Sequence, residues 1–391
     1  MAKQGQSEEH EAVTRFLRLC LRGHRDPAAL EAAAASVVQD HLDWDTVNQI
    51  VRREGLAPLL YQITRGQDLF PPQIKEGMHS AYYRNAHRNL LLFHQLEHVL
   101  SHLTQEGVPA ILLKGAALTE VVYSNVAVRP MGDLDLLVRR KDVDSALQVL
   151  MALGYQPATL ELCDGYFITY RNHVQLIIPE EEKAPVEIHW SLFGPSYYYH
   201  AVSMDWFWQT ALPVHVGGVT AWVLGSEAQL LHLCAHILQH GGLRKARLIW
   251  LYDLAEVVAF YREQIHWDLV LACAQGYHLV LAVREVLNEL SQGWKAPIPA
   301  PVLEQLRALR TSRDEERTFV RLTTAHRPVQ NFWANLGAIR GWRARLGFIR
   351  CVALPSANYM QYRYRIPHRL LLPFYYPYRW LRSLRDLSRC R

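Results

Sequence analysis

The spacing of apolar and polar residues divides the chain into helical and strand-forming stretches. From Glu9 to about Leu100 apolar residues recur with helical spacing, and a long amphipathic helix is predicted from about Pro72 to Glu106. The buried stripe of this helix is expected to contain several apolar residues, namely Leu90, Leu91, Phe93, Leu96 and Leu100. The first part of the chain is therefore predicted to be a helical region.

The pattern changes at Gly107, where short apolar runs replace the long amphipathic ones. Val108–Leu113 has the length of a buried strand, and Leu134–Val138 predicts a second strand. The other elements predicted here are a helix, Lys141–Leu153, and two more strands, Val174–Ile178 and Val186–Trp190. Together these elements predict a small α+β module with a mixed sheet.

After Trp190 the helical spacing returns, with helices predicted at Ser226–Gln239 and Leu248–Tyr261. We expect an α+β protein in which helical regions flank the module. The expected parts are an N-terminal helical region (1–106), the module (107–195), a C-terminal helical domain (196–337) and a segment rich in arginine and aromatic residues (338–391).

Composition is that of an ordinary globular protein. Half of the 391 residues are apolar and 20% are charged, which excludes a disordered or collagen-like chain. The six cysteines lie far apart without a C-x-x-C pair, so neither a zinc ribbon nor a disulfide framework is expected, and a reducing cytoplasm fits best. No run reaches the roughly 18 apolar residues of a membrane span, and no secretory signal is evident.

Positive charge is concentrated at one end. Residues 338–391 hold 12 arginines, no lysine and a single acid, Asp386, which leaves 30 basic and 36 acidic residues for the rest of the chain. Arginines are interleaved with tyrosine, phenylalanine and tryptophan there. Such a segment can bind RNA by stacking and phosphate contact, or lie on an anionic membrane surface. A third alternative is that it packs on the module, with its arginines around an anionic cleft.

Two aspartates begin the second predicted strand. Because side chains alternate along a strand, Asp133 and Asp135 point to one face while Leu134 and Leu136 are buried on the other. Two carboxylates this close repel each other unless a cation lies between them, and short oxygen ligands suit Mg²⁺. The pair predicts a metal site.

Two further groups strengthen this interpretation. In the last predicted strand Glu187 and His189 share a face, so a third carboxylate joins the pair if that strand is a neighbour of the first. Lys114-Gly115-Ala116 follows a buried strand and opens a helix. Small residues at such a place let backbone N–H groups approach phosphate, and Lys114 adds positive charge.

The order of these features resembles an uncharacterised bacterial nucleotidyltransferase family of the DNA polymerase β-like superfamily. The resemblance rests on Lys114-Gly115, on Arg129-Pro130, on Asp133-Leu134-Asp135-Leu136-Leu137-Val138 and on the later Glu187-Ile188-His189-Trp190, and it covers most of the chain. It implies a polymerase β-like module. The superfamily's Gly-Ser or Gly-Gly turn is Gly115-Ala116 here, and the gap to Asp133 is longer than usual.

The resemblance also implies a reaction. Asp133 and Asp135 are expected to bind two Mg²⁺ ions, with Mn²⁺ as a substitute, while Glu187 binds the catalytic ion and helps to accept the proton of an attacking hydroxyl. An NTP, with ATP as the default, would transfer its nucleoside monophosphate to a hydroxyl of a small-molecule, peptide or protein acceptor, and pyrophosphate would leave.

Other residues have two open interpretations. Arg129 either holds phosphate or fixes its loop, and His189 either orients Glu187 or touches the substrate. By the same resemblance His236, His240, Arg247 and Asp253 contact the nucleotide or acceptor, the alternative being helix-end charge compensation and core hydrogen bonds. His232, His236 and His240 do not form one zinc site, because the outer two are separated by about 12 Å of helical rise.

Two other functions remain open. A catalytically weak nucleotide-binding sensor or scaffold is suggested by Ala116 and the long gap before Asp133. A toxin-like enzyme acting on tRNA is suggested by the basic segment at 338–391.

Overall fold

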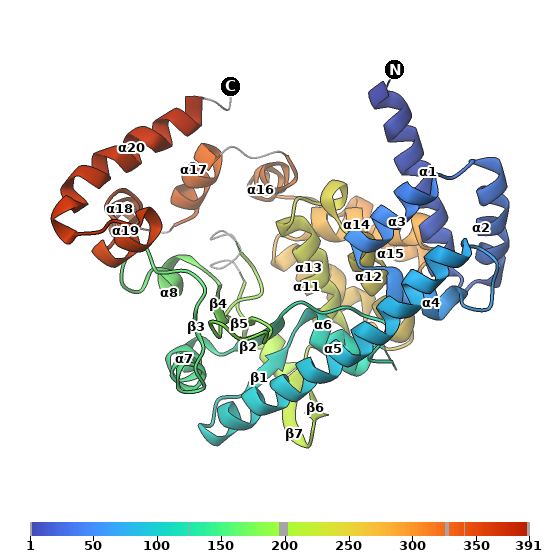
Figure 1. Ribbon diagram of the computed structural model, residues 1–391, viewed down its shortest axis with the longest axis horizontal. Helices are drawn as coiled ribbons and strands as arrows, with labels where there is room; N and C mark the ends of the chain where they lie inside the picture. Colours follow the sequence, from blue (N-terminus) through green and yellow to red (C-terminus); the bar gives the residue numbers. More distant parts are fainter. Residues whose placement is uncertain (1, 124, 195–201, 325–327, 340, 389–391) are drawn as a thin grey trace.

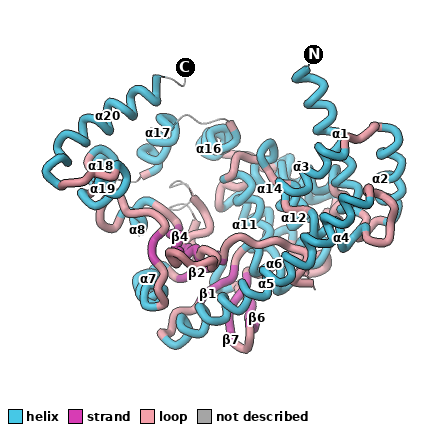
Figure 2. The backbone as a smooth tube through the Cα atoms, viewed as in Figure 1, coloured by secondary structure: helices cyan, strands magenta, loops and turns pink. Residues whose placement is uncertain are grey.

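A mixed sheet of seven strands lies at the centre of the computed structural model, which describes residues 2–123, 125–194, 202–324, 328–339 and 341–388. Helices cover both faces of the sheet (Figure 1), and helix is the prevailing structure (Figure 2). The α+β fold class is thus confirmed. The described residues contain no helix that is both long and apolar enough to cross a membrane.

The chain begins with helices, as predicted. Four of them pack together beside the end of the sheet, and the fifth runs across it (Figure 1). Their bounds are α1 (Ala2–Arg22), α2 (Pro27–Gln39), α3 (Trp44–Glu54), α4 (Ala57–Thr64) and α5 (Pro72–Gln105). The long helix expected from Pro72 to Glu106 is therefore confirmed as α5.

The buried side of α5 differs from the prediction at two positions. Leu96 and Leu100 are buried, but Leu90 and Leu91 are each 59% exposed, and Leu92 takes their place in the core. Successive helical residues are rotated by about 100°, so Leu90 lies on the opposite side from Leu92. The prediction was wrong at Leu90 and Leu91 because the buried stripe runs through Leu92 and Leu96, four residues apart.

The strand order in the sheet is β3-β4-β5-β2-β1-β7-β6. β2 is parallel to β5 and antiparallel to β1, which in turn is parallel to β7. The bounds are β1 (Ala110–Leu112), β2 (Leu134–Val138), β3 (Gln156–Pro157), β4 (His173–Ile177), β5 (Val186–His189), β6 (Leu212–Val216) and β7 (Val219–Val223). The four strands predicted between residues 107 and 195 are all present within one or two residues.

The hairpin of β6 and β7 was not predicted. It turns at Gly217-Gly218, where both residues have positive φ, and it joins the sheet beside β1. The expectation that the chain is helical after Trp190 is therefore wrong for this stretch. Among the described strands, β6 pairs with β7, and β7 joins the sheet through β1, about a hundred residues earlier, which no local pattern reveals. The expected boundary at residue 195 lies outside the described residues.

The two faces of the sheet pack against different helices. Leu134 and Leu136 lie on the face covered by α5 and α7, as predicted, while Leu137 lies on the face of the larger helical core. The helices that follow β1, as far as residue 323, are α6 (Lys114–Val121), η1 (Arg140–Asp142), α7 (Val143–Ala152), α8 (Tyr166–Tyr170), α10 (Asp205–Gln209), α11 (Ser226–Gln239), η2 (Leu243–Lys245), α12 (Leu248–Phe260), α13 (Trp267–Gly276), α14 (Val280–Gly293), α15 (Ala300–Ala308) and α16 (Arg313–Thr323).

The arginine-rich segment and the helix that precedes it form a helical lobe next to α8 (Figure 1). Its elements are α17 (Pro328–Ala338), α18 (Trp342–Ala353), α19 (Ala357–Tyr364), η3 (Arg369–Leu371) and α20 (Leu372–Ser388). Hydrogen bonds join it to the module: Tyr170 Oη donates to the Ala344 carbonyl at 3.1 Å, Ser356 N donates to the Leu162 carbonyl at 2.6 Å, and Ser356 Oγ donates to the Glu161 carbonyl at 3.5 Å. The lobe is therefore docked beside the sheet.

A disulfide between Cys163 and Cys351 also joins the lobe to the module, with 5.4 Å between the two Cα atoms. The sequence analysis predicted no disulfide, because the two cysteines are 188 residues apart and only the docking of the lobe brings them together. The cysteine pattern therefore no longer supports a reducing compartment.

We predict that Leu96→Ala lowers the free energy of unfolding by about 2–5 kcal/mol, because it leaves a cavity between α5 and the sheet. Leu90→Ala, which removes the same atoms from an exposed position of the same helix, is expected to change it by less than about 0.5 kcal/mol. Urea unfolding of the two variants measures both values. Equal effects would contradict the assignment of the buried face.

Candidate active site

Two carboxylates lie side by side on neighbouring parallel strands. Asp135 on β2 is in register with Glu187 on β5, and Gln175 on β4 is opposite Glu187. The expectation that Glu187 lies on the neighbouring strand is correct. Gln175 Nε2 donates to Glu187 Oε1 at 3.2 Å and so orients the carboxylate. Because Asp135 is only 2% exposed, its negative charge must be balanced within the protein.

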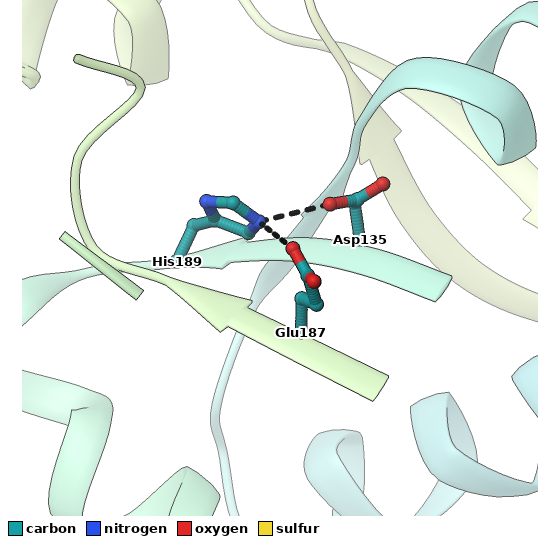
Figure 3. A group of neighbouring side chains, drawn as sticks. All are labelled: Asp135, Glu187 and His189. Carbon is teal, nitrogen blue, oxygen red and sulfur yellow. Dashed lines mark hydrogen bonds and ion pairs between the residues drawn. The ribbon is translucent and has the colours of Figure 1, made fainter. Parts of the chain in front are cut away.

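Lys114 and His189 supply that balance. The Lys114 ammonium donates to Asp135 Oδ1 at 2.7 Å and lies 4.0 Å from Glu187 Oε2. His189 Nε2 is 2.9 Å from the same Asp135 oxygen and 3.3 Å from Glu187 Oε2, so the ring bridges the two carboxylates (Figure 3). This contact favours the role of orienting Glu187, one of the two roles expected for His189.

The pKa values of this cluster follow from burial and opposite charge. Burial alone raises the pKa of Asp135, but the Lys114 ammonium and the hydrogen bond from His189 outweigh it, and the pKa falls well below the usual range. Burial lowers the pKa of His189, but its hydrogen bonds to Asp135 and Glu187 raise that pKa by more, so the net shift is upward. The imidazole of His189 thus keeps its proton to a higher pH than usual, beside an Asp135 carboxylate that stays ionised.

Asp133 occupies a different position. It lies in the loop just before β2, half-buried, and the pKa of its carboxyl is raised to about 6, first by burial and then by the nearby charge of Asp135. Among the described residues, the group whose ligand atoms lie within 4.8 Å of one another consists of Asp135, Glu187 and His189, without Asp133. Two carboxylates and an imidazole form a donor set that fits a divalent cation.

A cavity of about 420 Å³ opens above the cluster and contains most of the predicted site residues. It lies between the carboxylate edge of the sheet and the helices α11 and α12. The residues that line it and were predicted are Lys114, Gly115, Arg129, Asp133, Asp135, Glu187, His189, His236, His240 and Arg247. A volume of this size is sufficient for a nucleotide-sized ligand.

Ala116 and Asp253 do not line this cavity. Ala116 is buried in the core at the start of α6, one residue beyond Gly115. A Cβ at Gly115 would lie 2.9 Å from Met131 Cγ, so the glycine lets α6 pack against the loop that leads to Asp133. Lys114 itself has a positive φ of 48°, which turns its side chain from the end of β1 toward Asp135.

Asp253 lies behind the cavity and holds Arg129. The Arg129 guanidinium donates to both oxygens of Asp253, at 2.8 Å from Nη2 to Oδ2 and 2.9 Å from Nε to Oδ1. Tyr123 Oη donates to the same carboxylate at 2.7 Å. Asn89, on α5, donates to the carbonyl of Arg129 at 2.8 Å. These contacts favour the second role expected for Arg129, that of fixing the loop that ends at Asp133.

The sequence analysis missed several cavity residues. Those it did not single out are Met131, Gly132, Asn172, His173, Leu192, Gln239 and Trp250, and it considered His232 only as a zinc ligand. The alternation of β4 puts His173 and Gln175 opposite the buried Val174 and Leu176, so that pattern was available. Trp250 is found only in the fold, where its ring contacts those of His236 and His240 at 4.8 and 5.2 Å between centroids.

His232 is unusual among these residues. It is 3% exposed, and neither ring nitrogen has a hydrogen-bond partner among the described residues. Burial lowers the pKa of His232 to about 3, and the positive charge of Lys114 contributes to the same shift. The ring is therefore neutral, with one donor and one acceptor available beside the cavity.

Comparison with known proteins identifies the family. Residues 40–290 match a family described as an uncharacterised nucleotidyltransferase. The chain belongs to this family. The matched residues include all of the sheet and the helices α11 and α12 that enclose the cavity. Membership indicates transfer of a nucleoside monophosphate, with an NTP as co-substrate, and confirms the resemblance found in the sequence.

Two solved structures are similar to this nucleotidyltransferase over about half of its chain. The solution structure of the antibiotic-resistance factor ANT(2'')-Ia aligns with a TM-score of 0.32 and 10% identity, covering 53% of this chain and 95% of that one. The crystal structure of an antigenic nucleotidyltransferase-like protein from Paracoccidioides brasiliensis aligns with a TM-score of 0.34 and 13% identity, covering 55% and 96%. Similarity this low supports no argument about the site. No curated protein matches the chain.

We predict that Asp253→Asn destabilises the nucleotidyltransferase by about 3–5 kcal/mol, because it leaves the buried Arg129 guanidinium without its counter-charge. Tyr123→Phe removes a single hydrogen bond from the same carboxylate and is expected to cost about 1.5 kcal/mol. Denaturant unfolding provides the measurement. An Asp253→Asn effect no larger than that of Tyr123→Phe would show that Arg129 does not depend on this pair.

A second prediction concerns pH. The folded pKa of Asp133, about 6, lies above its ordinary value, so the folded state binds the proton more tightly and loses stability as pH rises from about 4 to 6. Asn cannot ionise. In metal-free protein, Asp133→Asn is expected to be more stable than the parent by about 1–2 kcal/mol above pH 6 and equal to it near pH 4. Thermal unfolding across this range, with chelator present, measures the difference, and a constant difference would contradict the assigned environment.

Proposed function

We propose that this nucleotidyltransferase transfers a nucleoside monophosphate, AMP by default, from an NTP to a hydroxyl group of an acceptor molecule. The observation that carries the proposal is the pairing of Asp135 with Glu187 across β2 and β5, at the base of the cavity that Asp133 also lines. Carboxylates in register on adjacent strands repel each other. This repulsion destabilises the folded protein, and a bound cation relieves it.

The donor atoms support divalent cations at this site. Asp133, Asp135 and Glu187 would hold two Mg²⁺ or Mn²⁺ ions, which when bound supply positive charge next to the attacking and leaving oxygens. In the protein alone, Lys114 and His189 neutralise the same carboxylates. Both side chains lie in the cavity, so Lys114 is available to a phosphate once the carboxylates have another counter-charge.

In the proposed reaction the acceptor oxygen forms a bond to the α-phosphorus of the NTP. The bond from that phosphorus to the bridging oxygen of the β-phosphate breaks, and pyrophosphate leaves. The hydroxyl proton passes to the carboxylate of Glu187, which Gln175 and His189 hold in place.

The nucleotide would lie against α11 and α12. His236, His240 and Arg247 line that side of the cavity, together with the Trp250 ring, which offers an apolar face for a base. Arg129 acts as a positioning residue: its guanidinium is fully engaged by Asp253 and the Pro130 carbonyl, so it fixes the loop that carries Asp133. Because transfer requires a supply of NTP, we propose a cytoplasmic location.

We predict that Asp133→Asn, Asp135→Asn and Glu187→Gln each lower transfer by about 10³-fold or more, since each removes a charge from the group that holds the cations. The measurement is the release of labelled product from each α-labelled NTP with Mg²⁺ and cell extract. Asp144→Asn, an exposed carboxylate on α7, is the matched control and is expected to retain full activity.

Absence of any transfer that depends on Asp133 and Asp135 would contradict the proposal. Calorimetry with a non-hydrolysable NTP and Mg²⁺ then distinguishes the alternative: binding without turnover would identify a nucleotide sensor or scaffold. Label found in bulk tRNA would instead identify tRNA as the acceptor.

A further inference from the structure

α20 has one side that packs on the lobe and another that faces solvent. The packed side is held by hydrogen bonds to the end of α18 and the turn after it: Trp380 Nε1 donates to the Ala353 carbonyl at 2.8 Å, and Tyr376 Oη donates to the Pro355 carbonyl at 2.8 Å. Arg379 Nη2 donates to the Val352 carbonyl at 3.1 Å. α20 is thus fixed in orientation, on the side of the lobe away from the sheet (Figure 1).

The solvent-facing side of α20 is apolar. Leu370, in the turn that leads into the helix, is 87% exposed, Phe374 is 73% exposed and Leu381 is 67% exposed. With Tyr378, which is also exposed, these residues follow one another at spacings of four, four and three, so they form a continuous row along one side. We call these four residues the α20 row. Tyr378 contacts the rings of Tyr364 and Tyr375, whereas Leu370, Phe374 and Leu381 are each more than two-thirds exposed, and apolar side chains at this exposure are unfavourable in water.

The charge around the α20 row is predominantly positive. Arg363, Arg365, Arg369 and Arg382 are exposed on or near η3 and α20. Residues 338–391 contain 12 arginines against one acid, while the rest of the chain has more acids than bases. A partner for this surface must therefore offer both apolar contact and negative charge.

We infer that the α20 row inserts into the interface of a lipid bilayer that carries anionic headgroups, with the surrounding arginines at headgroup level. An amphipathic helix with a basic polar side and a row of leucine and aromatic side chains binds membranes in this way without crossing them. RNA is a poorer fit, because Leu370 and Leu381 offer no ring on which a base can stack. The chain is then a peripheral membrane protein, and its acceptors include those reached at a membrane surface.

The experiment is co-flotation of the full-length protein with vesicles of phosphatidylcholine alone or mixed with phosphatidylglycerol. The parent protein is expected to bind the mixed vesicles at least about tenfold more strongly than the neutral ones, and added salt should weaken that binding. Leu370→Ser combined with Phe374→Ser should lower the binding at least about tenfold. Leu90→Ser combined with Leu91→Ser is the matched control, since it removes comparable exposed apolar groups from α5 and should leave binding unchanged.

A second pair of variants tests the charge. Arg363→Gln combined with Arg382→Gln is expected to lower binding to the mixed vesicles about tenfold and to leave the weak binding to neutral vesicles unchanged. Melting temperatures equal to that of the parent will show that the exposed replacements do not unfold the lobe. Failure of the parent to bind the mixed vesicles would overturn the inference, as would an equal loss in the α5 control.

Binding of tRNA tests the alternative that this surface is an RNA site. If tRNA binds more tightly than the vesicles, and the two serines leave that binding unchanged, the surface is an RNA site and the inference is wrong. Vesicle binding is independent of the proposed reaction, because Asp135→Asn is expected to float like the parent. Loss of the α20 row should leave transfer to a water-soluble acceptor unchanged, so failure of either proposal can be distinguished from failure of the other.

Discussion

Repulsion between carboxylates on two central strands of the sheet is the constraint on which the rest of this structure depends. Asp135 and Glu187 lie in register on adjacent parallel strands, and Asp133 lies in the loop just before β2. An arrangement of this kind is stable in a buried place only when cations lie beside it. Lys114 and His189 take that role in the protein alone, through contacts of 2.7 and 2.9 Å to one oxygen of Asp135. The positive φ of Lys114 and the bridging ring of His189 follow from this requirement.

The same constraint explains why distant parts of the chain meet around the site. Asp133 lies in a loop, so its position depends on what holds the loop, and Arg129 is anchored by Asp253 from α12 and by Asn89 from α5. The helices before and after the sheet therefore contribute to one site. This accounts for a family match that extends from residue 40 to residue 290, well beyond the strands themselves.

The lobe of α17 to α20 lies outside that match, yet it is tied to the module close to the site. Tyr170, at the end of α8, contacts the lobe through Ala344 and Phe348, and β4 with His173 and Gln175 begins only three residues later. The Cys163–Cys351 disulfide adds a covalent link on the same side. α18 of the lobe is thus joined to the segment just before the strand that orients Glu187.

Much of this organisation could be predicted from local spacing. The period of two in Leu134–Val138 placed Asp135 on the face opposite Leu134 and Leu136, and the period of 3.6 identified α5 and α11, because both patterns depend only on residues within about one turn. The family resemblance could likewise be found from Asp133, Asp135 and Glu187 in order along the chain. What local spacing misjudged were Leu90 and Leu91, since an apolar residue does not have to be buried.

By itself, then, the sequence determined the secondary elements around the site and the chemical identity of its carboxylates. The tertiary structure alone decided which groups neutralise them, that Asp253 acts through Arg129, that β6 and β7 extend the sheet, and that Cys163 meets Cys351. Each of these is a contact between residues far apart in the chain, 124 positions for Arg129 and Asp253 and 188 for the cysteines. Such contacts arise from packing and charge compensation over the whole fold, for which no short stretch of sequence carries the information.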